Sequence, residues 1–147
     1  MNLKRVSTAV MALCLGAGMA FAAGEPQAER QALMKKIGGS MGELGAIAKG
    51  QKPYDAATVK TAVSTISASA KDFPNHFPAG SETGMDTAAS PAIWQNMADF
   101  KAKAMKLSTD ADTVLASMPT DQASVGQALQ TLGADCGTCH QAYRLKR

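Results

Sequence analysis

The sequence predicts an all-α protein that folds as an antiparallel four-helix bundle. Beyond residue 22, no stretch alternates apolar and polar residues as a half-buried strand would. Instead, four segments, several of them rich in alanine, carry apolar residues every three or four positions, which is the spacing of an amphipathic helix. The connections inside the first and the last pair of segments are short, and one longer crossover joins the pairs. This order of connections is typical of a four-helix bundle.

The first helix is expected to run from about Pro26 to Lys49. Its apolar stripe consists of Leu33, Ile37, Met41, Leu44 and Ala48. The same segment contains four glycines, each of which weakens a helix by up to about 1 kcal/mol relative to alanine: Gly38, Gly39, Gly42 and Gly45. So many glycines indicate either an irregular helix or the close approach of another backbone or a flat ligand.

The second helix is expected to begin after Asp55, a favourable N-cap residue, and to end at Pro74. Its stripe consists of Val59, Val63, Ile66, Ala70 and Phe73. Residues 74–90 contain two prolines and two glycines and have no periodicity. They predict one long crossover loop.

The third helix is expected to start at Ser90 and Pro91, a cap residue followed by a first-turn proline, and to end at Pro119. Its stripe consists of Ile93, Met97, Phe100, Ala104, Leu107, Ala111, Val114 and Met118. The last helix is expected to begin near Thr120 or Ser124. Its stripe consists of Val125, Leu129, Leu132, Cys136, Cys139 and Tyr143.

The N-terminal segment predicts a cleaved signal peptide over residues 1–22, which leaves residues 23–147 as one domain. Lys4 and Arg5 precede an uncharged apolar stretch, and Ala20 and Ala22 supply the small residues of a cleavage site. The apolar run is shorter than the roughly 20 residues that a spanning helix needs. We therefore expect an exported, soluble protein without membrane insertion.

Cleavage also changes the charge and the cysteine content. Losing Lys4 and Arg5 lowers the formal net charge from +3 to +1, which gives no reason to expect binding to nucleic acid or to an anionic membrane. Cys14 leaves with the signal peptide, so the mature chain keeps Cys136 and Cys139. A disulfide across so short a loop would restrict the unfolded chain very little.

The two cysteines belong to a C-x-x-C-H motif that ends at His140. On a helix, positions i, i+3 and i+4 project from one face. Two thiols on that face can add to the vinyl groups of a haem, and the imidazole can reach the iron from the same side. The motif therefore predicts a bundle that carries one covalently attached haem c.

Three other uses of the motif are weaker. Structural zinc requires four ligands, and the mature chain offers only these three and the distant His76. A thioredoxin-like redox pair would need a βαβ context, which the sequence lacks. A pair of core cysteines followed by an incidental histidine is the third.

Only seven residues follow His140, so an earlier helix has to cover the opposite face of the haem. The first helix is the best source, because it carries Met34 and Met41 together with the glycines. A flat ring could approach that helix closely.

Four segments resemble the class II c-type cytochromes, and within them cytochrome c′: residues 29–50, 52–57, 77–94 and 136–144. The resemblance implies a periplasmic four-helix bundle that transfers electrons, frequently as a homodimer formed through the first two helices, with periplasmic redox partners. It also implies a five-coordinate haem iron that binds nitric oxide or carbon monoxide.

Carried over to this chain, the resemblance makes Cys136 and Cys139 the thioether attachments and His140 the axial iron ligand. Met34 would lie above the open face of the iron. The other expected haem contacts are Arg30 and Gln31 at the haem edge and propionates, Ser81 and Glu82 in the crossover loop, and Arg144 on the proximal side.

Met34 leaves two coordination states open. As expected for cytochrome c′, it would block the sixth site without bonding, and the iron would stay five-coordinate. Some low-spin members of the class instead use methionine here as the sixth ligand, which makes the protein a pure electron carrier. A peroxidase is not expected, because that chemistry needs a distal acid–base group and Met34 is apolar.

Four further residues receive structural interpretations. Met41 is expected in the core, His76 in a solvated loop, and Trp94 and Tyr143 in aromatic packing near the haem. Arg144 could also serve simply as a cation near a helix C-terminus.

Overall fold

The computed structural model describes residues 25–146, so the predicted signal peptide lies outside the described residues. The helices are α1 (Pro26–Ala48), α2 (Ala56–Asp72), the 3-10 helix η1 (Phe73–His76), α3 (Ala92–Gln95), α4 (Met97–Ala116) and α5 (Gln122–Tyr143). The prediction of an all-α bundle is confirmed.

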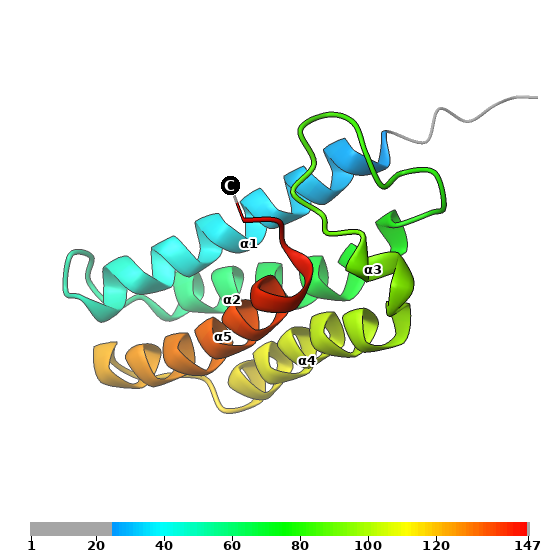
Figure 1. The fold of residues 1–147 in the computed structure, drawn as a ribbon. Coiled ribbons are helices and arrows are strands. Elements are labelled where there is room, and N and C mark those ends of the chain that lie inside the picture. Colours follow the sequence, from blue (N-terminus) through cyan, green and yellow to red (C-terminus); the bar gives the residue numbers. More distant parts are fainter. Residues whose placement is uncertain (1–24, 147) are drawn as a thin grey trace, which may run out of the picture.

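The four long helices form a bundle in which neighbours run antiparallel (Figure 1). Helix α1 packs beside α2 and α5, and α4 packs beside the same two helices from the other side. The connections α1–α2 and α4–α5 are short, as predicted, and the longer crossover lies between η1 and α3.

Local sequence explains where α2 and α5 begin. Asp55 Oδ1 accepts a hydrogen bond of 2.7 Å from the backbone N–H of Thr58, as predicted for an N-cap. The last helix begins at Gln122, because Asp121 and Ser124 form a reciprocal capping box. The predicted start near Thr120 or Ser124 therefore brackets the observed one.

The predicted third helix is divided in two at Asn96. Its backbone there has φ −138° and ψ 54°, which ends the single turn of α3 and starts α4. Among the described residues, Asn96 makes no side-chain capping hydrogen bond; its backbone N–H closes α3 on Ala92 O at 3.0 Å, and its carbonyl accepts the first bond of α4 from Phe100 N at 3.1 Å. The break lets Ile93 join an aromatic cluster with Phe77, Phe100 and Tyr143, separate from the main core.

The main core runs along the bundle axis between the four long helices. Its buried residues include the predicted stripe positions Ile37, Leu44, Val59, Val63, Ile66, Leu107, Ala111, Val125 and Leu132. Within the described residues, no helix is long and apolar enough to cross a membrane.

The crossover after η1 lies beside the N-terminal half of α1 and returns to the end of α5 (Figure 1). Ser90 N donates to Tyr143 O at 2.9 Å, and Leu145 N donates to Ala88 O at 2.9 Å. These bonds flank an isolated antiparallel bridge between Ala89 and Arg144. The loop is therefore fastened directly after the C-x-x-C-H motif.

Candidate functional site

One end of the bundle contains a cavity of about 790 Å³ between α1, α4, α5 and the crossover loop. This volume lies within the roughly 300–1,000 Å³ typical of cofactor sites. Most of its walls are apolar, and they include Met34, Ile37, Met41, Phe77, Ile93, Phe100, Leu107 and Tyr143.

Helix α5 brings Cys136, Cys139 and His140 together on the cavity wall. Both cysteines are free and half-buried, and burial raises the pKa of both thiols. Burial, followed by the charge of Arg144, lowers the pKa of His140. A neutral imidazole is the form that binds a metal.

Helix α1 brings Met34 to the same cavity, where its side chain is half-buried. A Cβ atom added at Gly38, one turn further along, would meet nothing within 4 Å, so the cavity has room beside this helix. Met41 packs against the main core, as predicted, and also lines the cavity.

Arg30 and Gln31 also line the cavity, but their hydrogen bonds go to the end of η1 and to the crossover loop. Arg30 is 4% exposed. Its Nη1 atom donates to His76 O at 3.1 Å and to Ser81 Oγ at 2.9 Å, while Nη2 donates to Ser81 O at 2.8 Å and to Thr87 Oγ1 at 3.3 Å. The guanidinium therefore holds the loop from several directions.

Aromatic rings and two glutamines complete this attachment. The Arg30 guanidinium lies 4.6 Å from the centroid of the Phe77 ring and 5.7 Å from that of Trp94. Gln27 Nε2 donates to Thr83 O, and Gln31 Nε2 donates to Met85 O, each at 2.7 Å. We call Gln27, Arg30 and Gln31 the loop clamp.

Two predicted haem contacts, Ser81 and Glu82, are not among the described residues that line the cavity. Ser81 is buried and accepts hydrogen bonds from Arg30. Glu82 is half-buried, and its negative charge opposes the lowering of the Arg30 pKa that burial causes. Arg144, by contrast, lines the cavity.

Two other interpretations can be compared with the structure. His76 lies in η1, where its Nε2 atom is 3.0 Å from Asp72 Oδ2, and its side chain is partly exposed. Trp94 belongs to the aromatic cluster, but within the described chain it does not line the cavity, whereas Tyr143 does.

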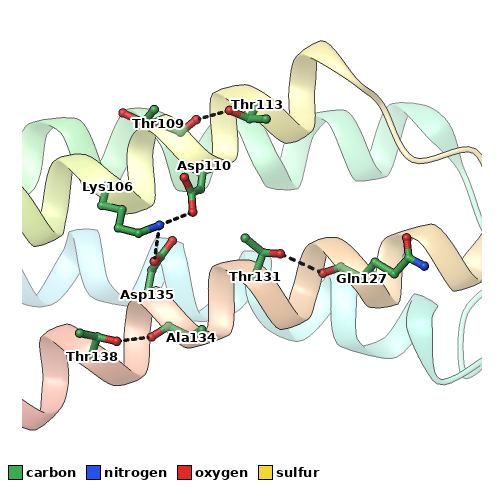
Figure 2. A network of polar contacts seen from close by, with 9 residues as sticks. All are labelled: Lys106, Thr109, Asp110, Thr113, Gln127, Thr131, Ala134, Asp135 and Thr138. Carbon is green, nitrogen blue, oxygen red and sulfur yellow. Dashed lines mark hydrogen bonds and ion pairs between the residues drawn. The ribbon is translucent and has the colours of Figure 1, made fainter.

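Asp135, which directly precedes Cys136, is a further residue of the site that the sequence did not predict. It lines the cavity, is 8% exposed and lies 3.1 Å from Lys106 Nζ (Figure 2). Its Oδ2 atom has no hydrogen-bond partner among the described residues, and neither has Gln27 Oε1. The sequence signal for Asp135 was its spacing: it lies three positions after the apolar Leu132, on the same face of the helix.

These features fit a covalently attached haem. Two thiols and an imidazole share one cavity wall, a thioether sulfur comes from another helix, and the remaining walls are mainly apolar. Lys35, Lys103 and Arg144 add positive charge around the same cavity. This donor set is that of a c-type haem site.

Known proteins share both the sequence and the fold. The chain is 63% identical to a cytochrome c-556 of Agrobacterium fabrum, with 100% of this chain and 99% of that protein covered. It is 33% identical to a cytochrome c′ of Rhodopseudomonas palustris, with 97% of each covered. The solved cytochrome c′ of Rhodopseudomonas palustris has a TM-score of 0.79 at 32% identity, covering 84% of this chain and 98% of that one.

The family described as cytochrome C′ matches residues 25–144, which include the loop clamp, the crossover loop and the whole C-x-x-C-H motif. Proteins of this family carry covalently bound c-type haem. The chain belongs to the cytochrome c′ family.

Proposed function

We propose that the protein is a periplasmic electron carrier in which Cys136 and Cys139 hold one haem c, and His140 and Met34 are the two axial ligands. The observation that carries this proposal is that α5 and α1 bring these four side chains to one mainly apolar cavity. When bound there, haem supplies a one-electron redox couple.

Greater similarity to relatives that are not named cytochrome c′ supports a bonded Met34, because some low-spin members of this class use methionine at this position as the sixth ligand. The relatives named cytochrome c-556 and cytochrome c-554 are 63% and 41% identical to this chain, compared with 33% for the cytochrome c′ of Rhodopseudomonas palustris. We therefore propose the six-coordinate state in place of the five-coordinate state that the sequence resemblance alone favoured.

Each part of the cavity wall has a role in this proposal. Partial desolvation and the charge of Arg144 favour the neutral form of the His140 imidazole, although the residue as a whole is exposed. The apolar side chains of the cavity would exclude water from the iron. The positive charges of Lys103 and Arg144 would stabilise the reduced state of the haem. They would also pair with the ionised haem carboxylates. None of these roles requires a large movement of the bundle.

A five-coordinate site that binds nitric oxide or carbon monoxide is the second candidate. It is favoured by the many cytochrome c′ structures among the fold neighbours, which include a nitric oxide complex of a cytochrome c prime mutant from Alcaligenes xylosoxidans at 30% identity and a TM-score of 0.70. In that case Met34 would exclude polar ligands and admit only small neutral ones.

Absorption spectra of the reduced protein, with and without nitric oxide or carbon monoxide, separate the two candidates. A bonded Met34 gives sharp, split alpha and beta bands before gas is added, and Met34→Ala abolishes them. Met41→Ala is the matched control, because Met41 lines the same cavity from the same helix. A wild-type spectrum without split bands, or one that Met34→Ala leaves unchanged, contradicts the six-coordinate proposal.

Peroxidase activity has little support from the arrangement of the cavity. The guanidinium of Arg30 lines the cavity, but its donors are directed to Ser81, His76 and Thr87. A guanidinium used in this way is a poor distal acid–base group. Electron transfer is also the general role of the family.

A homodimer through α1 and α2 remains part of the proposal. A shallow groove between these helices is lined mainly by small residues, among them Gly39, Ser40, Ala57, Thr61 and Ala62. Small residues permit close packing of a second copy. Sedimentation of the wild type and of Thr61→Arg tests this, and a monomer in both would contradict it.

A further inference from the structure

A polar group joins helices α4 and α5 (Figure 2). One of its members, Asp135, lines the cavity. Lys106 Nζ lies 2.6 Å from Asp110 Oδ2 and 3.1 Å from Asp135 Oδ1. Lys106 is 61% exposed, whereas Asp135 is 8% exposed. The three residues therefore connect solvent with a buried carboxyl group that lines the cavity.

The surroundings of Asp135 favour its neutral form. Its Oδ2 atom is buried without a hydrogen-bond donor, and an ionised oxygen in that position loses hydration without compensation. Burial raises the pKa of Asp135, and the neighbouring Asp110 raises it further, while Lys106 opposes both effects. Asp110 is more exposed, and its hydrogen bond with Lys106 lowers its pKa.

The other charged groups around the cavity come from all sides. Arg30 and Lys35 belong to α1, Asp86 to the crossover loop and Lys103 to α4, and on α5 itself His140 and Arg144 follow Asp135. Lys103 Nζ lies 3.5 Å from Asp99 Oδ1, and the negative charge of Asp99 offsets part of the positive charge of Lys103. Within the described residues, the group that faces Asp135 at hydrogen-bond distance is the Lys106–Asp110 pair.

We propose that Asp135 takes up a proton when the protein is reduced and releases it on oxidation, so that electron transfer is coupled to proton transfer. For each electron that enters the cavity from the redox partner, one proton passes from water to the Asp135 carboxylate, and both leave again on oxidation. This inference rests on the proposed electron-carrier function.

Electrostatics supplies the driving force. An added electron places negative charge in the cavity that Asp135 lines, and in a site of low dielectric constant like charges repel strongly. Protonation of Asp135 removes that repulsion. Asp110 and Lys106 lie between Asp135 and solvent and provide the route for the proton.

The test is the midpoint potential of the haem-loaded protein as a function of pH, together with direct measurement of proton uptake on reduction in weak buffer. In the wild type the potential should fall with pH within one window, by at most about 59 mV for each tenfold change in proton activity. Asp135→Asn should remove this fall and the matching proton uptake. Redox-difference infrared spectra should also lose a carboxylic-acid band.

Two further variants sharpen the test. Asp112→Asn is the matched control, because Asp112 lies on the same helix as Asp110 but bonds to Ser67 of α2, and it should keep the wild-type profile. Lys106→Met removes the cation that stabilises ionised Asp135, so the window should move to higher pH. This shift tests the proposal even if Asp135→Asn fails to load haem.

The possible outcomes distinguish a failure of the proposed electron-carrier function from a failure of the proposed role of Asp135. A protein that is not reduced reversibly by one electron contradicts the proposed function itself. A protein that is reduced reversibly, but whose proton uptake is the same in the wild type and in Asp135→Asn, overturns only the role of Asp135. An unmoved window in Lys106→Met would also overturn it.

Discussion

Arg30 in α1 donates hydrogen bonds to both the hydroxyl and the backbone carbonyl of Ser81, at 2.9 and 2.8 Å. The two residues are 51 positions apart, and this pair anchors the crossover loop to the helix that carries Met34. The loop also bonds to the end of α5 through Ala88 and Ser90. It therefore links the helix of Met34 to the helix of His140.

Replacing Arg30 should destabilise the protein strongly. Arg30→Met leaves buried acceptors of Ser81 without a donor, which costs about 1–3 kcal/mol for each unpaired group. Arg30→Lys should recover only part of the loss, because an ammonium group cannot reproduce the planar fork of a guanidinium. The free energy of unfolding of the holoprotein, measured with denaturant, checks both variants.

A matched surface change gives the control for Arg30. Lys52→Met removes an exposed ion pair with Glu43 and should cost no more than about 1 kcal/mol. An Arg30→Met protein as stable as Lys52→Met would show that the loop clamp contributes little.

Tyr143 should make stability depend on alkaline pH. Its hydroxyl donates a hydrogen bond of 2.6 Å to Asp99, and this bond, followed by burial, raises its pKa to about 12. Because an unfolded tyrosine titrates near pH ~10, the stabilisation is complete below about pH 10 and is lost as pH rises toward 12. Tyr143→Phe should be less stable at neutral pH and should lack this alkaline loss.

The same hydrogen bond also makes stability depend on acid pH, where the stabilisation is lost as pH falls. It lowers the pKa of Asp99, so this contribution is present above the ordinary aspartate range and disappears as pH falls through the lowered value. Thermal unfolding measured from acid to alkaline pH checks both sides. Tyr54→Phe is the control, since Tyr54 donates to Pro119 O instead, and its profile should keep both losses.

Two glycines should respond to alanine in opposite directions. Gly84 has φ +93°, so Gly84→Ala should destabilise the protein by about 1–2 kcal/mol through backbone strain. Gly42 lies inside α1, where a Cβ would meet nothing within 4 Å, so Gly42→Ala should stabilise the protein by up to about 1 kcal/mol. Denaturant unfolding of the pair checks the signs, and equal effects would contradict the assigned backbone roles.

Much of the fold was predictable because it depends on local chemistry. The extents of α1 and α2 and the capping role of Asp55 follow from periodicity, from Gly50 and Pro74, and from one side-chain hydrogen bond. The division at Asn96 was not predictable in this way, since the heptad pattern continues through it. The break depends on the aromatic cluster that Ile93 joins, and that cluster combines distant parts of the chain.

The candidate site likewise has features that the sequence predicted and features that depend on contacts between distant segments. The resemblance predicted Met34, Arg30, Gln31 and Arg144 as haem contacts, and the structure brings all four to the cavity. The resemblance did not show that Arg30 is engaged by the crossover loop. Ser81 and Glu82 remain predictions as haem contacts, because they are not among the described residues that line the cavity.

By itself the sequence determined the helical class of this protein and predicted the attachment chemistry, because Cys136, Cys139 and His140 lie within two turns of one helix and need only local geometry to share a face. Only the tertiary structure decided that Met34 enters the same cavity and that Asp135 is buried beside it with an unpaired oxygen. The physical reason is that burial and helix pairing depend on contacts between segments far apart in the chain, which no local pattern records.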